Sequence, residues 1–463
     1  MAEPAKFLTG NLFRHIAVMS LTASFGLMAI FAVDLVDMLF ISMLGQEELA
    51  AAIGYAGALL FFTSSFGIGM AIAGGALVAR ALGAGDEALA ARRASNTLVL
   101  GVLFGAAFAA LVWVLLPQLT SLVGASGRTQ ELAINYLRII VPSLPLLLIG
   151  MVGSAILRAH GEARLAMMAT IWAGVVNAVL DPIFIFGLGL ELQGAAIASV
   201  ASRITMGFAA LYPLLRRTGV LARPDPAGLA QDLSPVVTMA FPAILTQLAT
   251  PVGQAFVTRS MAQFGEEAVA GMAIAGRLTP VAFGVIFALS GAVGPIIGQN
   301  FGAGDHRRVR QGFRDAILFT ALAVGLASLI LFVLRGPIAD LFSATGLTRE
   351  IVFLFCGPLA LMWFFNGVIF VSNASFNNLG HPYYSTWVNW GRHTLGTVPL
   401  VLLGASWLGA AGVLIGQAMG GLVFGGLAFW LARRVMALEA AGGSVAEPFH
   451  PHIRLMQVFH LRR

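Results

Sequence analysis

Two carboxylates inside a long apolar stretch are the residues of this sequence best suited to chemistry. Asp34 and Asp37 stand three positions apart within residues 33–41, so a helix would place both on one face. A carboxylate in the middle of a bilayer costs roughly 2.5–3.5 kcal/mol on insertion scales and therefore faces a cavity or a partner. Because two like charges repel each other in an apolar medium, the pair is a candidate for binding and releasing a proton.

A second set of oxygen donors lies further along the chain. Asn177 and Asp181 stand four positions apart, again on one helix face, and Pro182 frees a backbone carbonyl about one turn back. Ser199 adds a hydroxyl in the next apolar stretch. Such hard oxygen donors suit either proton exchange or a small cation such as Na⁺. We therefore predict a cation-coupling site made of Asp34, Asp37, Asn177, Asp181 and Ser199, in which Na⁺, if it is the ion, binds at Asp37, Asn177 and Asp181.

Cationic and aromatic side chains within apolar stretches form a second candidate set. Arg203, Arg277 and Arg392 could line a cavity, or could pair with a buried aspartate in a structural ion pair. A histidine such as His393 can titrate near neutral pH, and the aromatic faces that are frequent in the second half attract organic cations. We predict a substrate cavity that includes Arg203, Arg277, Arg392, His393 and Trp390.

The whole chain is too apolar for a soluble protein. Of its 463 residues 58% are hydrophobic and 10% are charged, with a mean hydropathy of +0.88, whereas a soluble domain has roughly 25% charged residues. The net charge of +6 does not indicate nucleic-acid binding, because the arginines stand in short loops between apolar segments. The sequence therefore predicts an all-α integral membrane protein.

No motif of an enzyme accompanies these features. The sequence has no phosphate-binding loop, nucleophile motif or nucleotide domain, and its single cysteine, Cys356, excludes an internal disulfide. No Cys or His cluster has metal-ligand spacing. We expect a protein that is not an enzyme and needs no cofactor beyond a coupling ion, H⁺ or Na⁺, so that its energy comes from an ion gradient or from a partner.

Twelve segments have the length of about 20 apolar residues that spans a bilayer. Six lie in each half, at residues 15–43, 51–79, 94–116, 135–157, 165–188, 194–215, 236–262, 268–298, 314–334, 351–377, 383–403 and 409–432. The predicted divisions are a first lobe (1–215), a linker with Pro224, Pro226 and Gly228 (216–234), a second lobe (235–435) and a polar tail (436–463).

The two halves repeat each other. Residues 81–86, Ala-Leu-Gly-Ala-Gly-Asp, recur 219 positions later as residues 300–305, Asn-Phe-Gly-Ala-Gly-Asp. Duplicated helical bundles are a common architecture of transporters, and we read Asp86 and Asp305 as helix N-caps. The second half lacks the acids, since Val257 stands at the position that matches Asp37. We therefore expect the first lobe to couple to the ion and the second to supply substrate surface.

Positive charge predicts the orientation, because Lys and Arg near span ends are retained in the cytoplasm. With the N-terminus inside, nineteen of these residues fall on the inner side and five on the outer side. Both termini are therefore predicted to be cytoplasmic.

Taken together, the motifs resemble the multidrug and toxin extrusion (MATE) family. The resemblance covers residues 10–435 and rests on Asp37 followed by residues 40–45, the two Gly-Ala-Gly-Asp loops, and Asn177 with Asp181 ahead of Phe186-Gly187. It implies an electrochemically driven antiporter that exports cationic, often aromatic, drugs through a cleft between the lobes. It also maps Asp37, Asn177, Asp181 and Ser199 onto the first-lobe cation site of some prokaryotic branches. Thr22 stands where many members have a proline.

Two functions from different classes stay open. The first is a multidrug antiporter of the bacterial inner membrane that works as a monomer, with small organic molecules and membrane lipid as its partners and no role for nucleic acid. The second is a flippase or exporter of a lipid-linked precursor, which should show more spans or a strongly cationic cavity for phosphate groups.

Overall fold

The computed structural model describes residues 5–44 and 46–442, and this part of the chain is almost wholly helical, without a strand. Gly45, which ends the first-span motif, and residues 443–463, most of the predicted tail, lie outside the described residues. The first lobe contains α1 (Leu12–Ser42), α2 (Glu47–Gly83), α3 (Glu87–Val114), α4 (Leu116–Leu122), α5 (Gly127–Ile140), α6 (Leu144–Ala159), α7 (Ala163–Pro182) and α8 (Glu191–Arg216). The second lobe contains α9 (Pro226–Ala262), α10 (Glu266–Gly302), α11 (His306–Leu341), α12 (Gly346–Leu354), α13 (Ala360–Leu379), α14 (Pro382–Gly391) and α15 (Thr397–Ala440).

Eleven helical stretches within the described residues are long and apolar enough to span a bilayer. The last, Pro382–Ala440, holds 59 residues, about twice what one span needs. It reverses at Gly409, where φ is 61°, a left-handed conformation that favours glycine. After the reversal the backbones of Gly404 and Gly412 lie in contact. This stretch therefore makes two spans, which agrees with the twelve predicted.

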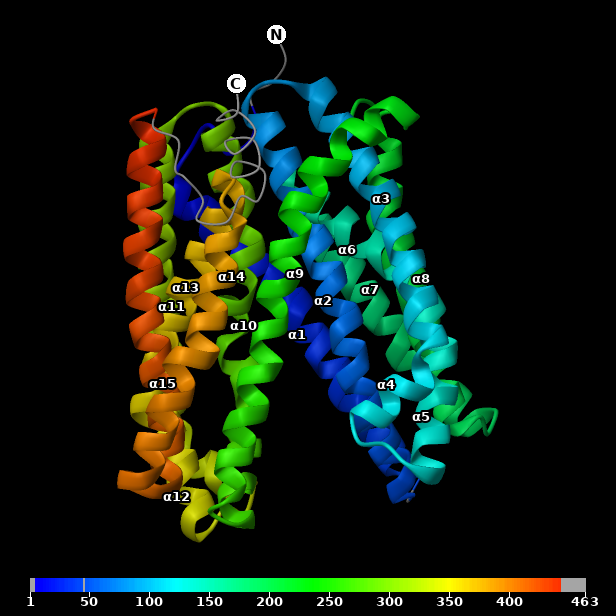
Figure 1. Ribbon diagram of the computed structural model, residues 1–463, viewed down its shortest axis with the longest axis vertical. Coiled ribbons are helices and arrows are strands. Elements are labelled where there is room, and N and C mark those ends of the chain that lie inside the picture. The colour runs from blue at the N-terminus through cyan, green and yellow to red at the C-terminus, as the bar shows by residue number, and fades with distance from the viewer. Residues whose placement is uncertain (1–4, 45, 443–463) are drawn as a thin grey trace, which may run out of the picture.

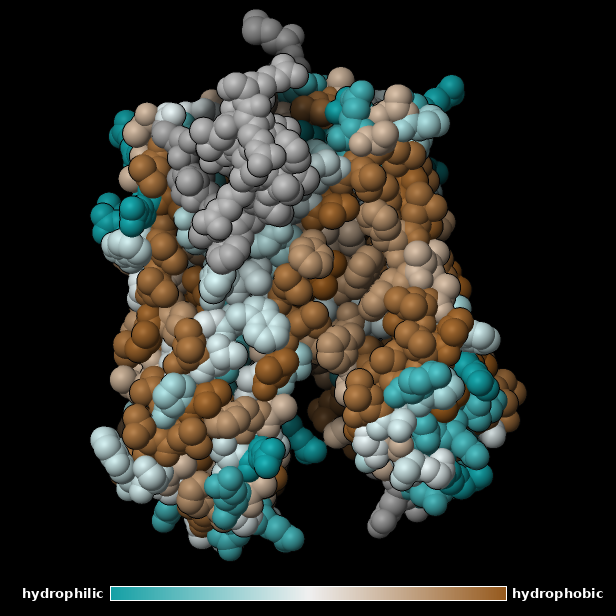
Figure 2. Space-filling model, in the orientation of Figure 1, coloured by the Kyte–Doolittle hydropathy of each residue, from teal (hydrophilic) through white to brown (hydrophobic). Residues whose placement is uncertain are grey.

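The two lobes stand side by side and separate toward one end (Figure 1). We call the end that carries α4 and α12 the open end, and the end where α2 leads into α3 the crossing end. On the face that Figure 2 shows, hydrophobic residues predominate between the two ends, hydrophilic ones gather near the ends, and a hollow enters between the lobes at the open end. This distribution is the one that a bilayer requires of a protein that spans it.

At the crossing end the backbones of α2 and α10 touch through two equivalent glycines. A Cβ atom on Gly83 would overlap the carbonyl oxygen of Gln299, and one on Gly302 would overlap the carbonyl oxygen of Arg80. Gly83 and Gly302 are 219 positions apart, as are Arg80 and Gln299, so the contact is reciprocal between the duplicated halves. Small residues allow helices to approach this closely in lipid.

The loops that follow this contact begin the next helices as the sequence predicted. The carboxylate of Asp86 accepts a hydrogen bond from the Leu89 amide at 2.8 Å, and that of Asp305 accepts one from the Arg308 amide at 2.9 Å. Both aspartates are therefore N-caps, which satisfy an amide at a helix start.

The packing at the crossing end does not follow the predicted division at the linker. Leu12, Ile16 and Met19 at the start of α1 are buried in one hydrophobic cluster with residues of α10 and α11. The side chain of Gln299 in α10 accepts a hydrogen bond from the Phe7 amide and donates one to the carbonyl oxygen of Ala159, both at 2.8 Å. The start of α1 therefore packs with the second lobe, and the lobes share a polar junction.

The predicted linker, residues 216–234, is shorter than expected. Only residues 217–225 are irregular, because Asp225 caps α9 by accepting a hydrogen bond from the Gly228 amide at 3.1 Å and Pro226 begins the helix. A proline at the first helical position is favourable, so the signal that we read as a linker marks a helix start.

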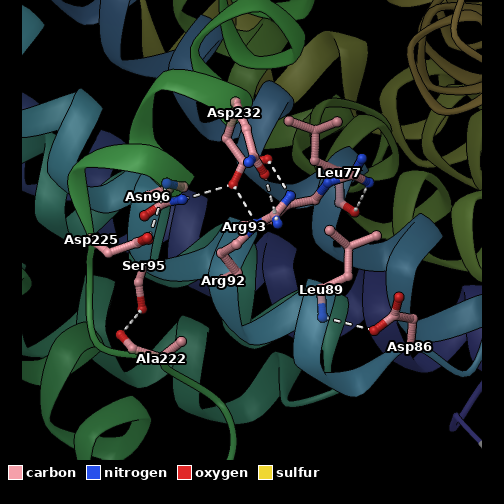
Figure 3. Close-up of polar contacts among 12 residues, drawn as sticks. Leu77, Asp86, Leu89, Arg92, Arg93, Ser95, Asn96, Ala222, Asp225 and Asp232 are labelled. Atoms are coloured by element: carbon pink, nitrogen blue, oxygen red, sulfur yellow. Dashed lines mark hydrogen bonds and ion pairs between the residues drawn. The ribbon is translucent and has the colours of Figure 1, made fainter.

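A buried carboxylate at the start of α9 ties the second lobe to α3 (Figure 3). Asp232 is 2% exposed. It accepts hydrogen bonds from Nε and Nη2 of Arg92, both at 3.2 Å, and from Nδ2 of Asn96 at 2.7 Å. The hydroxyl of Ser95 also donates to the carbonyl oxygen of Ala222 at 2.7 Å. The linker is thus bound to the first lobe on both sides of the α9 N-cap.

Substitution of Gly302 by Val should separate the helices at the crossing end. The obstacle to the new side chain is the backbone of α2, so the lobes must move apart at this end. The cost is about 1–3 kcal/mol, which shifts an equilibrium between two arrangements of the lobes about 5- to 150-fold.

The distance between two spin labels would measure this movement. Labels at Leu122 and Leu341, two exposed residues near the open end, should approach each other in a Cys356→Ser background. In Gly325→Val, where a Cβ meets no atom within 4 Å, the distances should stay unchanged. An unchanged distance distribution in Gly302→Val would contradict the view that the lobes move about the contact between α2 and α10.

Substitution of Asp232 by Ala should destabilise the folded protein by about 1.5–3 kcal/mol, because hydrogen bonds to a charged group are lost and Asn96 keeps a buried donor. Thermal unfolding in detergent would measure the effect. The matched control is Asp340→Ala, which removes the solvent-exposed ion pair with Arg349 and should cost about 0–1 kcal/mol. Equal losses of stability in the two variants would contradict the importance of the buried contact.

Candidate functional site

Two helices of the first lobe, α1 and α7, run side by side and bring the predicted acids together. A Cβ on Gly174 would lie 3.1 Å from Cγ2 of Val33, and one on Gly26 would lie 3.5 Å from Cβ of Thr170. The two contacts follow each other in the same direction along both helices. Asp37 and Asp181 come next along this seam, and their carboxylates approach each other.

We call the group formed by Asp37, Asn177 and Asp181 the acidic pocket, and several of its polar atoms lack a hydrogen-bond partner. Asp181 is 0% exposed and Asn177 is 7% exposed. Both carboxylate oxygens of Asp181, Oδ1 of Asp37 and Nδ2 of Asn177 are buried without a hydrogen-bond partner among the described residues. A buried charge is costly unless it is paired. The oxygen atoms of this pocket can therefore bind a proton or serve as ligands for a small cation.

The local backbone at this pocket is irregular. A π-helical turn, Ile183–Gly187, follows Pro182 directly, and such turns occur frequently at functional sites. Asp34 is near enough to Asp37 to feel the charge of Asp37. The side chain of Asp34 is exposed, however, whereas that of Asp37 is half-buried. Among the predicted residues, the buried pocket therefore contains Asp37, Asn177 and Asp181, and Asp34 lies at its edge.

Tyr136 of α5 belongs beside this pocket, although we did not predict it. Its side chain is buried, its hydroxyl approaches Ser199, and Asp37, Asp181 and Arg203 are close enough to act on it electrostatically. The sequence contained one signal, a hydroxyl at the start of the predicted span 135–157. Ser199 therefore contacts Tyr136, which in turn lies beside the pocket.

Arg203 braces the first lobe instead of facing the central cavity. One guanidinium nitrogen, Nη1, donates to the carbonyl oxygen of Ile140 at 3.1 Å and to the hydroxyl of Ser143 at 3.0 Å. These bonds join α8 to the short turn Val141–Ser143 between α5 and α6. Arg203 therefore has a structural role, but its partners are a backbone carbonyl and a hydroxyl, not the buried aspartate that the sequence left open as its partner.

A cavity of about 900 Å³ lies between the lobes and is lined by both. Of the residues predicted to line it, Arg392 and His393 do so, and Arg203, Arg277 and Trp390 are not part of its wall. Arg277 is exposed on α10, and the indole of Trp390 donates to the carbonyl oxygen of Leu245 at 2.9 Å. A helix position alone does not tell which face meets the cavity, and these predictions failed for that reason.

The cavity wall contains polar residues that we did not predict. Arg158 contributes from α6, and Asn366, Asn373 and Asn377 contribute from α13. The spacings of seven and four between these asparagines place them on one helix face, and that pattern was a usable signal. The described residues of the wall include two arginines and neither Asp nor Glu, so the wall does not favour the organic cations that we expected.

Comparison with known proteins agrees with this architecture. The MatE family model matches residues 22–183 and 242–402, one match in each lobe. An FAD transporter of Shewanella oneidensis is 30% identical over 441 residues, which cover 94% of this chain and 97% of that protein. The multidrug export protein MepA of Staphylococcus haemolyticus is 25% identical over 343 residues, which cover 73% of this chain and 75% of that protein.

Solved structures are similar along nearly the whole chain. The Vibrio cholerae MATE transporter VcmN in its bent form has a TM-score of 0.87 and 26% sequence identity, and the match covers 94% of this chain and 99% of that chain. Because the family model matches both halves, the chain belongs to the MATE family of membrane transporters, as its sequence motifs predicted.

Proposed function

We propose that this transporter is a secondary active antiporter that exports small organic molecules in exchange for H⁺ or Na⁺. The observation that carries the proposal is the pair of neighbouring carboxylates, Asp37 and Asp181. Oδ1 of Asp37 and both oxygens of Asp181 are buried without a hydrogen-bond partner among the described residues. Ionisable residues inside a membrane protein mark ion pathways by default. Ion and substrate would bind at different places, the ion in the first-lobe pocket and the substrate in the central cavity.

The same two helices form both places, and this supports a mechanism for coupling. On α1, Gly26 and Phe31 line the cavity and Asp37 lies in the pocket; on α7, Thr170 lines the cavity and Asp181 lies in the pocket. An ion that neutralises the carboxylates removes their repulsion, so the two helices can pack differently along the seam. Any such movement alters the cavity wall. Coupling of this kind is a difference in affinity between two conformations.

The proposed orientation places both termini in the cytoplasm of a bacterial cell and the open end outside its inner membrane. The contact of α2 with α10 would then close the cavity toward the cytoplasm, and the described conformation would be the outward-open one. We further propose that a single chain carries out transport, since ion pocket and cavity are both formed within it.

Two sets of compounds are candidate substrates. The first is the range of drugs handled by multidrug exporters such as MepA of Staphylococcus haemolyticus. The second is FAD or a related dinucleotide, which is favoured by the FAD transporter of Shewanella oneidensis, a relative that matches 94% of this chain.

Export should depend on both carboxylates. In proteoliposomes with an imposed H⁺ or Na⁺ gradient, Asp37→Asn and Asp181→Asn should each reduce gradient-driven movement of FAD or ethidium at least tenfold, because the neutral side chain no longer exchanges the ion. Only one of the two gradients should drive transport. Asp340→Asn, in the exposed ion pair with Arg349, should transport like the unaltered protein. Full export by well-folded pocket variants would refute the coupling role, and movement of polyprenyl pyrophosphate alone would favour the lipid-linked alternative.

The contact between Tyr136 and Ser199 should adjust ion affinity. Loss of one hydrogen bond costs about 0.5–1.5 kcal/mol, so Tyr136→Phe and Ser199→Ala should each raise the half-saturating ion concentration about 2- to 10-fold. Because both substitutions break the same contact, the double variant should resemble either single one. Additive effects would show that the two hydroxyls act independently.

A further inference from the structure

The central cavity has an unusual charge for a transporter of cations. Arg158 enters from the first lobe and Arg392 from the second, and the described part of the wall contains no carboxylate. The guanidinium group of each arginine forms neither a hydrogen bond nor an ion pair with a described residue. Partly buried guanidinium groups without a counter-ion are costly. An organic cation would meet two like charges in this cavity, whereas an anion would supply the missing partner.

The position of Arg158 makes it available to a ligand between the lobes. Its side chain reaches α10 of the second lobe, where a Cβ on Gly291 would lie 3.5 Å from its Nε. The absence of a side chain on Gly291, which also lines the cavity, leaves room for the guanidinium group there. Arg392 begins a π-helical turn, Arg392–Gly396, between α14 and α15. The two lobes thus each place one cation in the wall.

Neutral polar groups of the same wall also lack partners. The Oδ1 atoms of Asn366, Asn373 and Asn378, both ring nitrogens of His393 and the hydroxyl of Ser154 are buried without a hydrogen-bond partner among the described residues. All five residues line the cavity. Buried polar groups are nearly always hydrogen-bonded in folded proteins. The protein covers these particular atoms in this conformation, but the side chains that carry them line the cavity. We expect them to turn toward a ligand that has several hydrogen-bonding groups, such as the edge of a heterocycle.

An aromatic surface lies in the same wall. The ring of Phe287 is 5.6 Å from that of Trp363 and 5.7 Å from that of Phe370, measured between centroids, and all three residues line the cavity. Such a surface suits a flat ring. The volume of about 900 Å³ lies at the upper end of the range of about 300–1,000 Å³ for sites of drug-sized ligands.

We infer that the cavity selects anionic, planar aromatic compounds that carry phosphate or carboxylate groups. Arg158 and Arg392 pair with the anionic groups, the unpartnered asparagines and His393 bind the edge of the heterocycle, and the aromatic surface stacks on its face. This assignment rests on the proposed transport function and specifies its substrate class.

Matched fluorescent probes test the charge requirement. Riboflavin is neutral, and FMN is the same molecule with one added phosphate; ethidium is an aromatic cation. Equilibrium binding to the purified protein in lipid nanodiscs should be at least tenfold tighter for FMN than for riboflavin, and weakest for ethidium. Riboflavin or ethidium binding as tightly as FMN would overturn the assignment.

The arginines should account for the difference between the two flavins. Arg158→Gln and Arg392→Gln should each weaken FMN binding about 10- to 100-fold, the range for a charged hydrogen-bonded partner, and leave riboflavin binding nearly unchanged. Arg392→Lys keeps the charge and should restore part of the preference for FMN if the glutamine variant folds poorly. Arg335→Gln is the matched control, because Arg335 packs on the ring of Phe332 outside the cavity. Equal loss of both flavins in the arginine variants would indicate a structural role and refute the assignment.

The outcomes separate this assignment from the proposed antiport. Ethidium export that requires Asp37, together with no preference for FMN, would retain the antiporter and reject the anionic substrate. Selective FMN binding without gradient-driven transport would retain the site and reject the antiporter. Polyprenyl pyrophosphate carries the anion without the aromatic ring, so tighter binding of that lipid than of FMN would reject the aromatic part of the assignment.

Discussion

The contact between the backbones of α2 and α10 determines how everything else in this molecule is arranged. Gly83 and Gly302 allow two long helices to touch at one end, and the lobes attached to them can then separate only toward the other end (Figure 1). Gly83 and Gly302 occupy equivalent positions of the two repeats, so each half contributes the same contact to the other. A cavity that is closed at one end and open at the other follows from this single constraint. Gln299 and the start of α1 reinforce the closed end with bonds across the lobes.

The seam between α1 and α7 gives the cavity its connection to the acidic pocket. Gly174 and Gly26 keep the two helices close, so a change of charge at Asp37 and Asp181 acts on helices that also form the cavity wall. The pocket is buried within one lobe and the cavity lies between two. In the proposed antiporter, ion and substrate would therefore not compete for the same atoms, and the effect of one on the other would pass through helix packing.

The sequence predicted those features that depend on one element at a time. Span number, the duplication and the caps Asp86 and Asp305 follow from local pattern, and α7 carries Asn177 and Asp181 on one face as their spacing requires. Features that depend on two elements were missed. Tyr136 reaches the pocket only because α5 packs beside α8, and Arg158 enters the cavity only because Gly291 leaves space on the opposite lobe. Arg203 and Trp390 do not line the cavity, because the helix faces that carry them point toward backbone carbonyls of their own lobes. Pro226 marked a helix start where we expected a linker.

The divergence of the duplicated halves has an energetic consequence. The first lobe keeps acids in its pocket, and the second lobe has asparagines, Arg392 and His393 in the cavity wall. If an anion leaves while a cation enters, both movements carry positive charge inward across the membrane. A potential that is negative inside drives each elementary charge with about 2.3 kcal/mol per 100 mV. Export of a monoanion in exchange for one H⁺ or Na⁺ would thus draw on the potential twice, whereas export of a monovalent cation for the same ion would not draw on it at all. Opposite charges in the two sites therefore suit a transporter powered mainly by membrane potential.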